Sequence, residues 1–350
     1  MKKILLLLAF IIALPIQAYA ASPREVQYAH ALSRAISRDP SIVPLDRESR
    51  EAAANARQLL TEYFAIVNID RAAGEALYGQ RLMAIAESER LQRERQRLVL
   101  AAERNLRSHL ANIAGHKSNQ AVLEMTLTLQ ENTLEQTKLR LEHGMASEVD
   151  VREAELTAEQ TRLNLESLNL ALENERQSLN RLIHQPITAN IQVIYDIGDY
   201  DPLPENIDHF VRFNIARDHT ILYWQGQADV RRHEWQRQLD DPAVDNRYMR
   251  LQHQLAVLER NMAERMAEQN IRGALAEWER LQEVQIALEA ELEQARADYL
   301  DMQVRLEAGL VTQLAVDGMA VAYAAAEASL NRHAYDLWIA RLRLEHPYAL

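Results

Sequence analysis

The sequence predicts an all-α protein made of two tandem repeats of long antiparallel helical hairpins, of the α-barrel or coiled-coil type, with at most a short strand between the repeats. Three observations support this prediction. The 350 residues include only 9 glycines and 9 prolines, and a chain with so few helix breakers is expected to form long helices. A block of sequence occurs twice, and apolar residues recur at a seven-residue spacing.

Residues 1–20 are predicted to be an export signal. Lys2 and Lys3 precede an apolar run from Ile4 to Ile12, and Ala18-Tyr19-Ala20 has the small-x-small pattern of a cleavage site. The apolar run is shorter than the about 20 residues that a membrane-spanning helix needs. An uncleaved anchor is the alternative interpretation. We expect an exported protein that lies in the periplasm or associates with the outer membrane, and whose mature chain starts at Ala21.

The duplication is clearest in one octapeptide. Arg140-Leu-Glu-His-Gly-Met-Ala-Ser147 returns in the second half of the chain as Arg305-Leu-Glu-Ala-Gly-Leu-Val-Thr312. A second echo near the start of each half pairs Arg38-Asp-Pro-Ser-Ile-Val43 with Arg217-Asp-His-Thr-Ile-Leu222. Self-similarity of this kind indicates repeated structural units. The predicted organisation is a signal at residues 1–20, repeat one at 21–186, a linker at 187–206 and repeat two at 207–350.

Each repeat is expected to contain the same elements in the same order. A helix of about 25 residues begins near Pro44, or near His219 in the second copy. A break follows, around residues 68–74 and 240–246. Very long helices are then predicted over 76–143 and 247–308, with local bends where Gly115 and Gly273 interrupt them. Alternation in the linker, from Ile191 to Tyr195, predicts a short strand.

Two tip turns, at residues 144–147 and 309–312, are predicted to reverse the chain. Gly144 and Gly309 suit the left-handed position after a helix end. Ser147 and Thr312 are expected to cap the returning helices, which run to about residues 183 and 344 before Pro186 and Pro347.

The first returning helix carries two apolar seams. Val149, Leu156, Leu163 and Leu170 form one seven-residue series, and Leu165, Leu172 and Leu179 form another. A two-stranded coiled coil needs only one seam. Two seams therefore suit a helix with neighbours on both sides, as in a ring. A helix of 60 to 70 residues is about 90 to 105 Å long, which suits a rod or a tunnel wall.

Charge and composition exclude several kinds of function. The formal net charge is −12, and loss of the two signal lysines makes it −14, so a nucleic-acid partner is not expected. There is no cysteine for a disulfide or a thiolate metal site. The 11 histidines show no metal-ligand spacing, and no phosphate loop or nucleophile motif occurs. We predict no catalytic residues, no metal, no cofactor and no enzymatic activity.

The hairpin residues resemble the TolC-type outer-membrane efflux protein family, also called outer membrane factors. The similarity lies in Arg140-Leu-Glu-x-Gly144, Ser147-x-Val-Asp150-Val151 and Arg181-Leu-Ile-His-Gln-Pro186, and again in Leu306-Glu-Ala-Gly309 and Thr312-x-Leu-Ala-Val316. The chain departs from the pattern at His184, where glycine is common, and at Ala315, which stands in the place of Asp150.

This resemblance implies a homotrimer whose twelve helices wall a periplasmic tunnel. The tips would then meet a periplasmic adaptor (membrane fusion) protein that serves an inner-membrane transporter. The adaptor-docking residues that the resemblance implies are Gly144, Met145, Ala146, Ser147, Gly309, Leu310, Val311 and Thr312. The alternative is that these residues only make good turns. Glu148 and Asp150 could form an acidic gate, although acids in a first helical turn usually stabilise the helix N-terminus.

The chain departs from the family where membrane strands are expected. Family members cross the outer membrane with strands between the first two helices of each repeat, and a membrane strand needs about 9–11 residues of alternating character. Residues 63–69 are mostly apolar but do not alternate with polar residues. Residues 238–247 include Asp240, Asp241, Asp245 and Arg247, which are costly in lipid. We therefore expect tight turns at both places and no β-barrel.

The predicted function is a periplasmic α-helical conduit or docking component of a TolC-like tripartite efflux or type I secretion system that lacks the outer-membrane β-barrel. One alternative is a structural coiled-coil spacer without a lumen. The doubled seams and the repeated tips favour the conduit. The adaptor itself is a third possibility, but its β-rich domains have no counterpart in this sequence.

Overall fold

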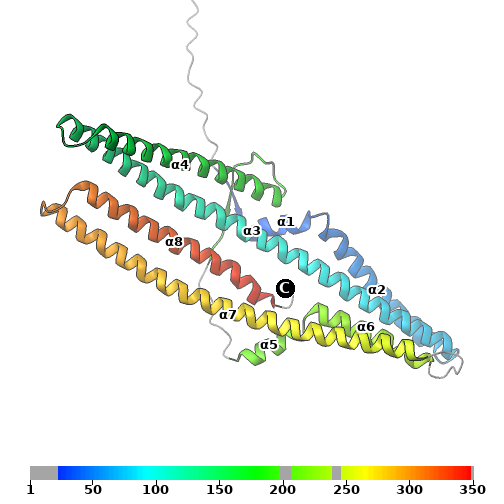
Figure 1. Cartoon of the computed structure of the whole chain (residues 1–350). Helices are drawn as coiled ribbons and strands as arrows, with labels where there is room; N and C mark the ends of the chain where they lie inside the picture. The colour runs from blue at the N-terminus through cyan, green and yellow to red at the C-terminus, as the bar shows by residue number, and fades with distance from the viewer. Residues whose placement is uncertain (1–22, 198–205, 239–245, 348–350) are drawn as a thin grey trace, which may run out of the picture.

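The computed structural model describes residues 23–197, 206–238 and 246–347, which form a layer of long helices with a small sheet near its middle (Figure 1). The predicted all-α fold of long helical hairpins is confirmed. In chain order the elements are β1 (Arg24–Gln27), α1 (Tyr28–Ser37), α2 (Ile42–Ile66), α3 (Arg71–Glu142), α4 (Glu148–Leu182), β2 (Ile191–Ile194), α5 (Ile207–Ile215), α6 (His219–Gln238), α7 (Asn246–Glu307) and α8 (Gln313–Glu345).

The order of elements is the same in the two halves of the chain. A strand, a short helix, a medium helix, a long helix and a returning helix run from β1 to α4 and again from β2 to α8. α3 has 72 residues and α7 has 62, so they are about 108 and 93 Å long. The α3–α4 and α7–α8 turns lie at the same end of the molecule (Figure 1). The division into repeats at residues 21–186 and 207–350 stays a prediction.

The long helices lie side by side in a defined order. In the half that carries the tips, α4 packs on α3, and α8 packs on both α3 and α7. In the other half, α2 packs on α3, and α6 packs on both α3 and α7. The order across the layer is therefore α4, α3, α8, α7 near the tips and α2, α3, α6, α7 away from them. One edge of the layer is formed by α4 and α2, and the other by α7.

The sheet joins the starts of the two halves. β1 and β2 pair in parallel, with Val26 opposite Val193. Both valines are buried in a core cluster with Leu106 of α3 and Leu179 of α4. β2 confirms the strand predicted in the linker. β1 was not predicted, because in this four-residue strand Val26 is the one buried side chain and no alternating pattern marks it.

The repeated Arg-Asp segments begin the medium helices. The Asp39 carboxylate accepts a hydrogen bond from the backbone N–H of Ser41, at 2.7 Å, just before α2. Asp218 accepts one from the backbone N–H of Thr220, also at 2.7 Å, before α6. Burial raises the pKa of Asp218, and its hydrogen bonds oppose that rise. The segment that occurs twice in the sequence thus begins a helix in both halves. Its aspartate accepts a backbone hydrogen bond, as N-cap residues do.

The turn between α2 and α3 is shorter than predicted. α3 begins at Arg71, so the prediction of a break that extends to Gly74 is wrong. Asp70 caps α3 by accepting a hydrogen bond from the Ala73 N–H at 3.0 Å. Gly74 is already helical and lies so close to α2 that an added Cβ would be 2.8 Å from the Val67 Cα. Close packing, rather than a break, therefore requires glycine here.

The glycines predicted to interrupt the two longest helices do not end them. α3 runs through Gly115 and α7 through Gly273 without a break in helical structure. The second predicted break, at 240–246, falls almost wholly on residues outside those that the structure describes, and the signal at residues 1–20 lies outside them as well.

Candidate functional site

The first hairpin tip, residues 144–147, is a tightly bonded turn. Gly144 adopts φ +71°, which is the left-handed conformation that glycine tolerates best. The Met145 N–H donates to the Arg140 carbonyl at 2.7 Å, and the Gly144 N–H donates to the Leu141 carbonyl at 2.9 Å. These two bonds form a Schellman motif, which satisfies carbonyls at the end of α3. The predicted role of Gly144 in the turn is confirmed.

A capping box begins α4 at the same tip. The Ser147 hydroxyl accepts a hydrogen bond from the Asp150 N–H at 3.2 Å, and the Asp150 carboxylate accepts one from the Ser147 N–H at 2.7 Å. Bonds from Ser147 lower the pKa of Asp150. Asp150 therefore stabilises the start of the helix, as the simpler interpretation predicted. Glu148 lies beside it in the exposed first turn, and a gate built from these acids stays a prediction.

The second tip, residues 309–312, has the same turn but a weaker cap. Gly309 adopts φ +69°, and the Leu310 N–H donates to the Arg305 carbonyl at 2.8 Å. The Thr312 hydroxyl accepts from the Ala315 N–H at 3.4 Å. Because alanine stands where Asp150 stands in the first copy, no carboxylate returns a bond at this tip. Thr312 is confirmed as an N-cap.

Both tips present an apolar side chain to solvent. Met145 is 70% exposed, and Leu310, at the matching place, is 74% exposed. Ala146 and Val311 are half-buried beside them. Exposed apolar residues of this size at the ends of two parallel hairpins form a suitable contact surface for a partner. The docking role of these residues itself stays a prediction.

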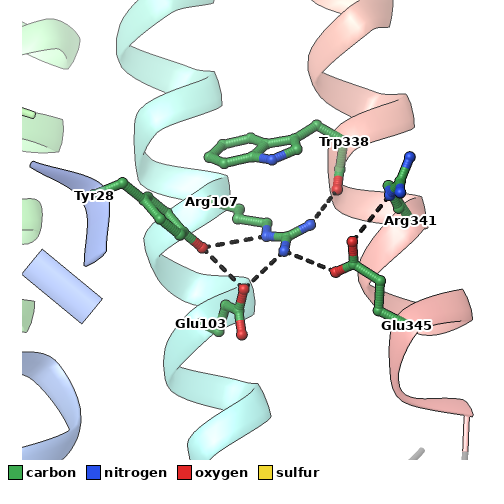
Figure 2. Close-up of polar contacts among 6 residues, drawn as sticks. All are labelled: Tyr28, Glu103, Arg107, Trp338, Arg341 and Glu345. Carbon is green, nitrogen blue, oxygen red and sulfur yellow. Dashed lines mark hydrogen bonds and ion pairs between the residues drawn. The ribbon is translucent and has the colours of Figure 1, made fainter. Parts of the chain in front are cut away.

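A buried arginine joins the two halves of the molecule, as Figure 2 shows. The Arg107 side chain, on α3, is only 7% exposed. Its guanidinium donates to the Tyr28 hydroxyl at 3.3 Å, the Trp338 carbonyl at 2.7 Å, Glu103 at 2.7 Å and Glu345 at 3.1 Å. A buried charge requires such partners, because an unpaired one would be very costly. Arg107 thus connects α1, α3 and α8.

Aromatic rings surround this arginine. The Arg107 guanidinium lies 5.1 Å from the centre of the Trp338 ring, which is within cation–π range. The Tyr195 ring stacks on that of Trp338 at 5.3 Å, and the Tyr28 ring lies 5.5 Å from it. Burial, followed by the Glu103 charge, raises the pKa of Tyr28. Since the charge is fully engaged by protein groups, the cluster is a structural junction.

The second half contains a counterpart of this arginine that the sequence analysis missed. Ala102-Glu103-Arg104-Asn105-Leu106-Arg107 returns as Ala267-Glu268-Gln269-Asn270-Ile271-Arg272. The signal was present, because the shift in numbering is the one that carries Arg140 onto Arg305 at the tips. Arg272 is 47% exposed and binds Glu268 at 2.9 Å and Asp208 at 2.8 Å. The same residue type is therefore buried in α3 and exposed in α7.

One of the two predicted seams of α4 faces solvent. Val149, Leu156, Leu163 and Leu170 are between 51% and 65% exposed. Leu172, in the other seam, is buried where α4 packs on α3. The residues that match the open seam in α8 are buried or half-buried in a helix that packs on α3: Leu314, Val321, Ala328 and Tyr335. The face of α4 that is open to solvent is thus equivalent to the face of α8 that is packed inside the chain.

The opposite edge of the layer also exposes apolar side chains. Along α7 these residues are between 50% and 60% exposed and are spaced by three or four positions, which places them on one face of the helix: Leu251, Leu255, Leu258, Met262 and Met266. A row of large apolar residues in solvent marks an interaction surface. Both edges of the layer therefore expose a row of large apolar side chains in a single chain.

Among the described residues, no group of three or more His, Cys, Asp or Glu side chains could hold a metal ion. His333 is buried, and its Nε2 donates to the Leu281 carbonyl at 2.7 Å, so it is a packing residue. Within residues 23–197, 206–238 and 246–347, no helix is both long enough and apolar enough to span a membrane.

Comparison with known proteins places the fold among outer-membrane channels. Neither a protein-family model nor a curated protein sequence matches the chain. Among solved structures, the outer membrane protein VceC of Vibrio cholerae is 14% identical, with a TM-score of 0.63 over 91% of this chain and 95% of that one. A membrane protein of Pseudomonas aeruginosa is 14% identical, with a TM-score of 0.64 over 91% and 89% of the two chains. The CmeC outer membrane channel of Campylobacter jejuni is 11% identical, with a TM-score of 0.64 over 92% and 85%. The chain therefore has the helical-hairpin fold of outer-membrane channel proteins, as the resemblance of its hairpin residues predicted.

Proposed function

We propose that this chain is an exported, periplasmic α-helical conduit or docking component of a TolC-like tripartite efflux or type I secretion system. The observation that carries the proposal is the pair of open edges on the helical layer. The seam of α4 that matches the buried seam of α8 is exposed, and so is the apolar row of α7. A single copy is thus a segment of a larger helical wall.

The contact inside the chain indicates how copies would join. α8 packs on α3, and α4 and α7 are the equivalents of α8 and α3 in the opposite repeats. Placing α4 of one copy on α7 of the next would repeat the internal contact. Such a head-to-tail interface produces a closed ring when the rotation between copies closes. A homotrimer, which the family resemblance implies, would then have a wall of twelve helices.

The short connection between α2 and α3 supports a conduit whose first repeat contributes no membrane strands. Only residues 67–70 separate the two helices, and a membrane strand needs about 9–11 residues. The corresponding segment of the second repeat lies outside the described residues.

The mass and shape of the assembled mature chain, residues 21–350, test the conduit. Light scattering and negative-stain microscopy without detergent should show a trimer that forms a hollow cylinder of about 100 Å, given the lengths of α3 and α7. A monomer, or a solid dimeric rod, would contradict the conduit and favour a structural coiled-coil spacer.

Docking of a periplasmic adaptor at the tips is tested separately by site-specific cross-linking in cells. The natural chain has no cysteine, so Met145→Cys and Leu310→Cys each introduce a single reactive site. Both variants should cross-link to an adaptor of an inner-membrane transporter. Phe64→Cys is the matched control, because Phe64 is 65% exposed near the α2–α3 turn at the opposite end. Equal capture at Phe64 would contradict docking at the tips.

A further inference from the structure

Arg107 and Arg272 occupy matching places but differ in what covers them. Over Arg107 lies Trp338 of α8, which provides its ring at 5.1 Å and its carbonyl at 2.7 Å. Over Arg272 the described chain provides only groups from α5 and from α7 itself, namely Asp208 and Glu268. Arg272 is therefore the equivalent of Arg107 without the covering helix.

The helix that would cover Arg272 in an assembly is α4 of a neighbouring copy. The shift that carries Arg107 onto Arg272 also carries Glu173 of α4 onto Trp338 of α8. The Glu173 side chain is 54% exposed and contacts only its own helix in the described interactions, with Arg176 at 3.9 Å and Gln177 at 3.3 Å. A carboxylate thus stands at the position that would meet a guanidinium.

We propose that Arg272 of one copy pairs with Glu173 of the next copy, and that this ion pair sets the register of α4 against α7 in the assembly. The proposal rests on the proposed function, because it requires copies of the chain to form a ring. It assigns a second copy of the chain as the occupant of the two open edges, since the carboxylate of Glu173 on one edge complements the guanidinium of Arg272 on the other. A carboxylate between copies replaces the indole ring that covers Arg107 within the chain.

The charged groups around Arg107 and Arg272 explain why a carboxylate can replace the indole ring at Arg272. Arg107 is enclosed by Glu103 and Glu345, and Arg341 binds the second oxygen of Glu345 at 2.9 Å (Figure 2). The equivalent of Arg341 in α4 is Arg176. The incoming α4 would therefore add one carboxylate and one guanidinium to Arg272 and its two acids, and so form an alternating cluster. Apolar residues on both sides, Leu170 on α4 and Met266 on α7, would shield the cluster from water.

A charge exchange in the mature chain tests the pair. Arg272→Glu should raise the concentration needed for assembly at least about tenfold in sedimentation velocity, and Glu173→Arg should do the same. The variant with both changes should restore assembly to within about threefold of the natural chain, because opposite charges meet again. A double variant no better than its weaker parent would overturn the proposal.

Arg296→Glu is the control on the same helix. Arg296 binds Glu293 at 3.8 Å and matches Glu131, which faces α4 within its own hairpin through Arg162 at 2.8 Å. It therefore lies on the side of α7 that faces α8 rather than on the open edge. Assembly of this variant should remain within about threefold of the natural chain, whereas a loss as large as that of Arg272→Glu would overturn the assignment.

Cross-linking gives an independent readout that tolerates weakened assembly. A short bis-maleimide should join Glu173→Cys chains to Arg272→Cys chains when the two are mixed, and neither variant alone should form a dimer. Dimers from Glu173→Cys alone would mean that α4 meets α4, and would overturn the register. A natural chain that stays monomeric would instead contradict the proposed function, so the two failures are distinguishable.

Discussion

α4 and α8 hold the same place in their repeats, yet they have different neighbours. α8 lies between α3 and α7, and both of its sides are packed. α4 packs on α3 with one seam and exposes the other, whose residues are between 51% and 65% exposed. The arginines follow the same division, because Arg107 is buried under α8 and Arg272 is exposed at the free edge. The difference shows that equivalent helix faces are packed within the chain in α8 and exposed to solvent in α4.

The largest effect is expected when the internal junction is broken. Arg107→Met removes the partner of Glu103, whose side chain is only 12% exposed. Breaking a buried pair on one side costs about 3–5 kcal/mol, so the free energy of unfolding from urea denaturation should fall by about that amount. Arg90→Met is the matched control on α3, because the Arg90–Glu87 pair is more than 40% exposed on both sides and should contribute about 1 kcal/mol or less. Equal losses would mean that burial does not distinguish these arginines.

A smaller effect should separate the two seams of α4. Leu172→Ala removes a side chain that is 6% exposed, and it should lower the free energy of unfolding by about 2–5 kcal/mol through the cavity that remains. Leu163→Ala, at 51% exposure, should change it by about 0.5 kcal/mol or less at concentrations where copies are separate. Its effect should appear instead as a weaker dependence of the unfolding midpoint on protein concentration. A large loss in separate copies would contradict an open seam.

The tip glycines should respond alike in the two repeats. Gly144→Ala and Gly309→Ala meet no steric obstacle, but each places a Cβ on a residue with φ near +70°. The left-handed conformation should therefore lower the free energy of unfolding by about 1 kcal/mol. Gly273→Ala is the control with the opposite sign, because Gly273 is helical and also has open space around it, and alanine stabilises a helix by about 1 kcal/mol. Thermal unfolding measures all three variants. A rise in Tm for Gly144→Ala or Gly309→Ala, or a fall for Gly273→Ala, would contradict this account.

The smallest effect concerns the caps of α4 and α8. Asp150→Asn removes the carboxylate of the capping box, and amide hydrogen exchange in the first turn of α4 should become faster. Because the pKa of Asp150 is lowered in the folded chain, its contribution is present above the ordinary aspartate pKa of about 3.9 and is lost as the pH falls through the lower folded value. Acid should therefore loosen the start of α4 more than that of α8, where Ala315 replaces the aspartate. Equal acid sensitivity of the two helix starts would contradict this account.

Much of the fold could be predicted because its signals are local or periodic. The tip turns depend on glycine, a following cap and short hydrogen bonds, all within a few residues. The strand at Ile191–Ile194 showed in its alternation, and the helix starts after Asp39 and Asp218 showed as an echo. The turn after α2 was misplaced, because Gly74 serves close packing on Val67 and its sequence gives no sign of that contact.

The candidate site was only partly visible in the sequence. The tips were predicted, and their geometry as turns is as expected, whereas their contact with an adaptor stays a prediction. The repeated Glu-x-x-x-Arg segment of α3 and α7 could have been found with the same shift that relates the two tips. The different burial of the two arginines could not be predicted, since Arg107 and Arg272 are the same residue type and each has a glutamate four positions before it. Only the covering helix distinguishes them.

The sequence by itself determined the repeat, the long helices, the tip turns and the caps, because these depend on periodicity and on bonds between near neighbours in the chain. Only the tertiary structure decided which seam of α4 is buried, that β1 pairs with β2, and that Arg107 is enclosed while Arg272 faces solvent. Each of those outcomes depends on groups brought together from distant parts of the chain, as Tyr28, Arg107 and Trp338 are. Burial is a property of the neighbours that the fold supplies, and no local pattern of residues contains it.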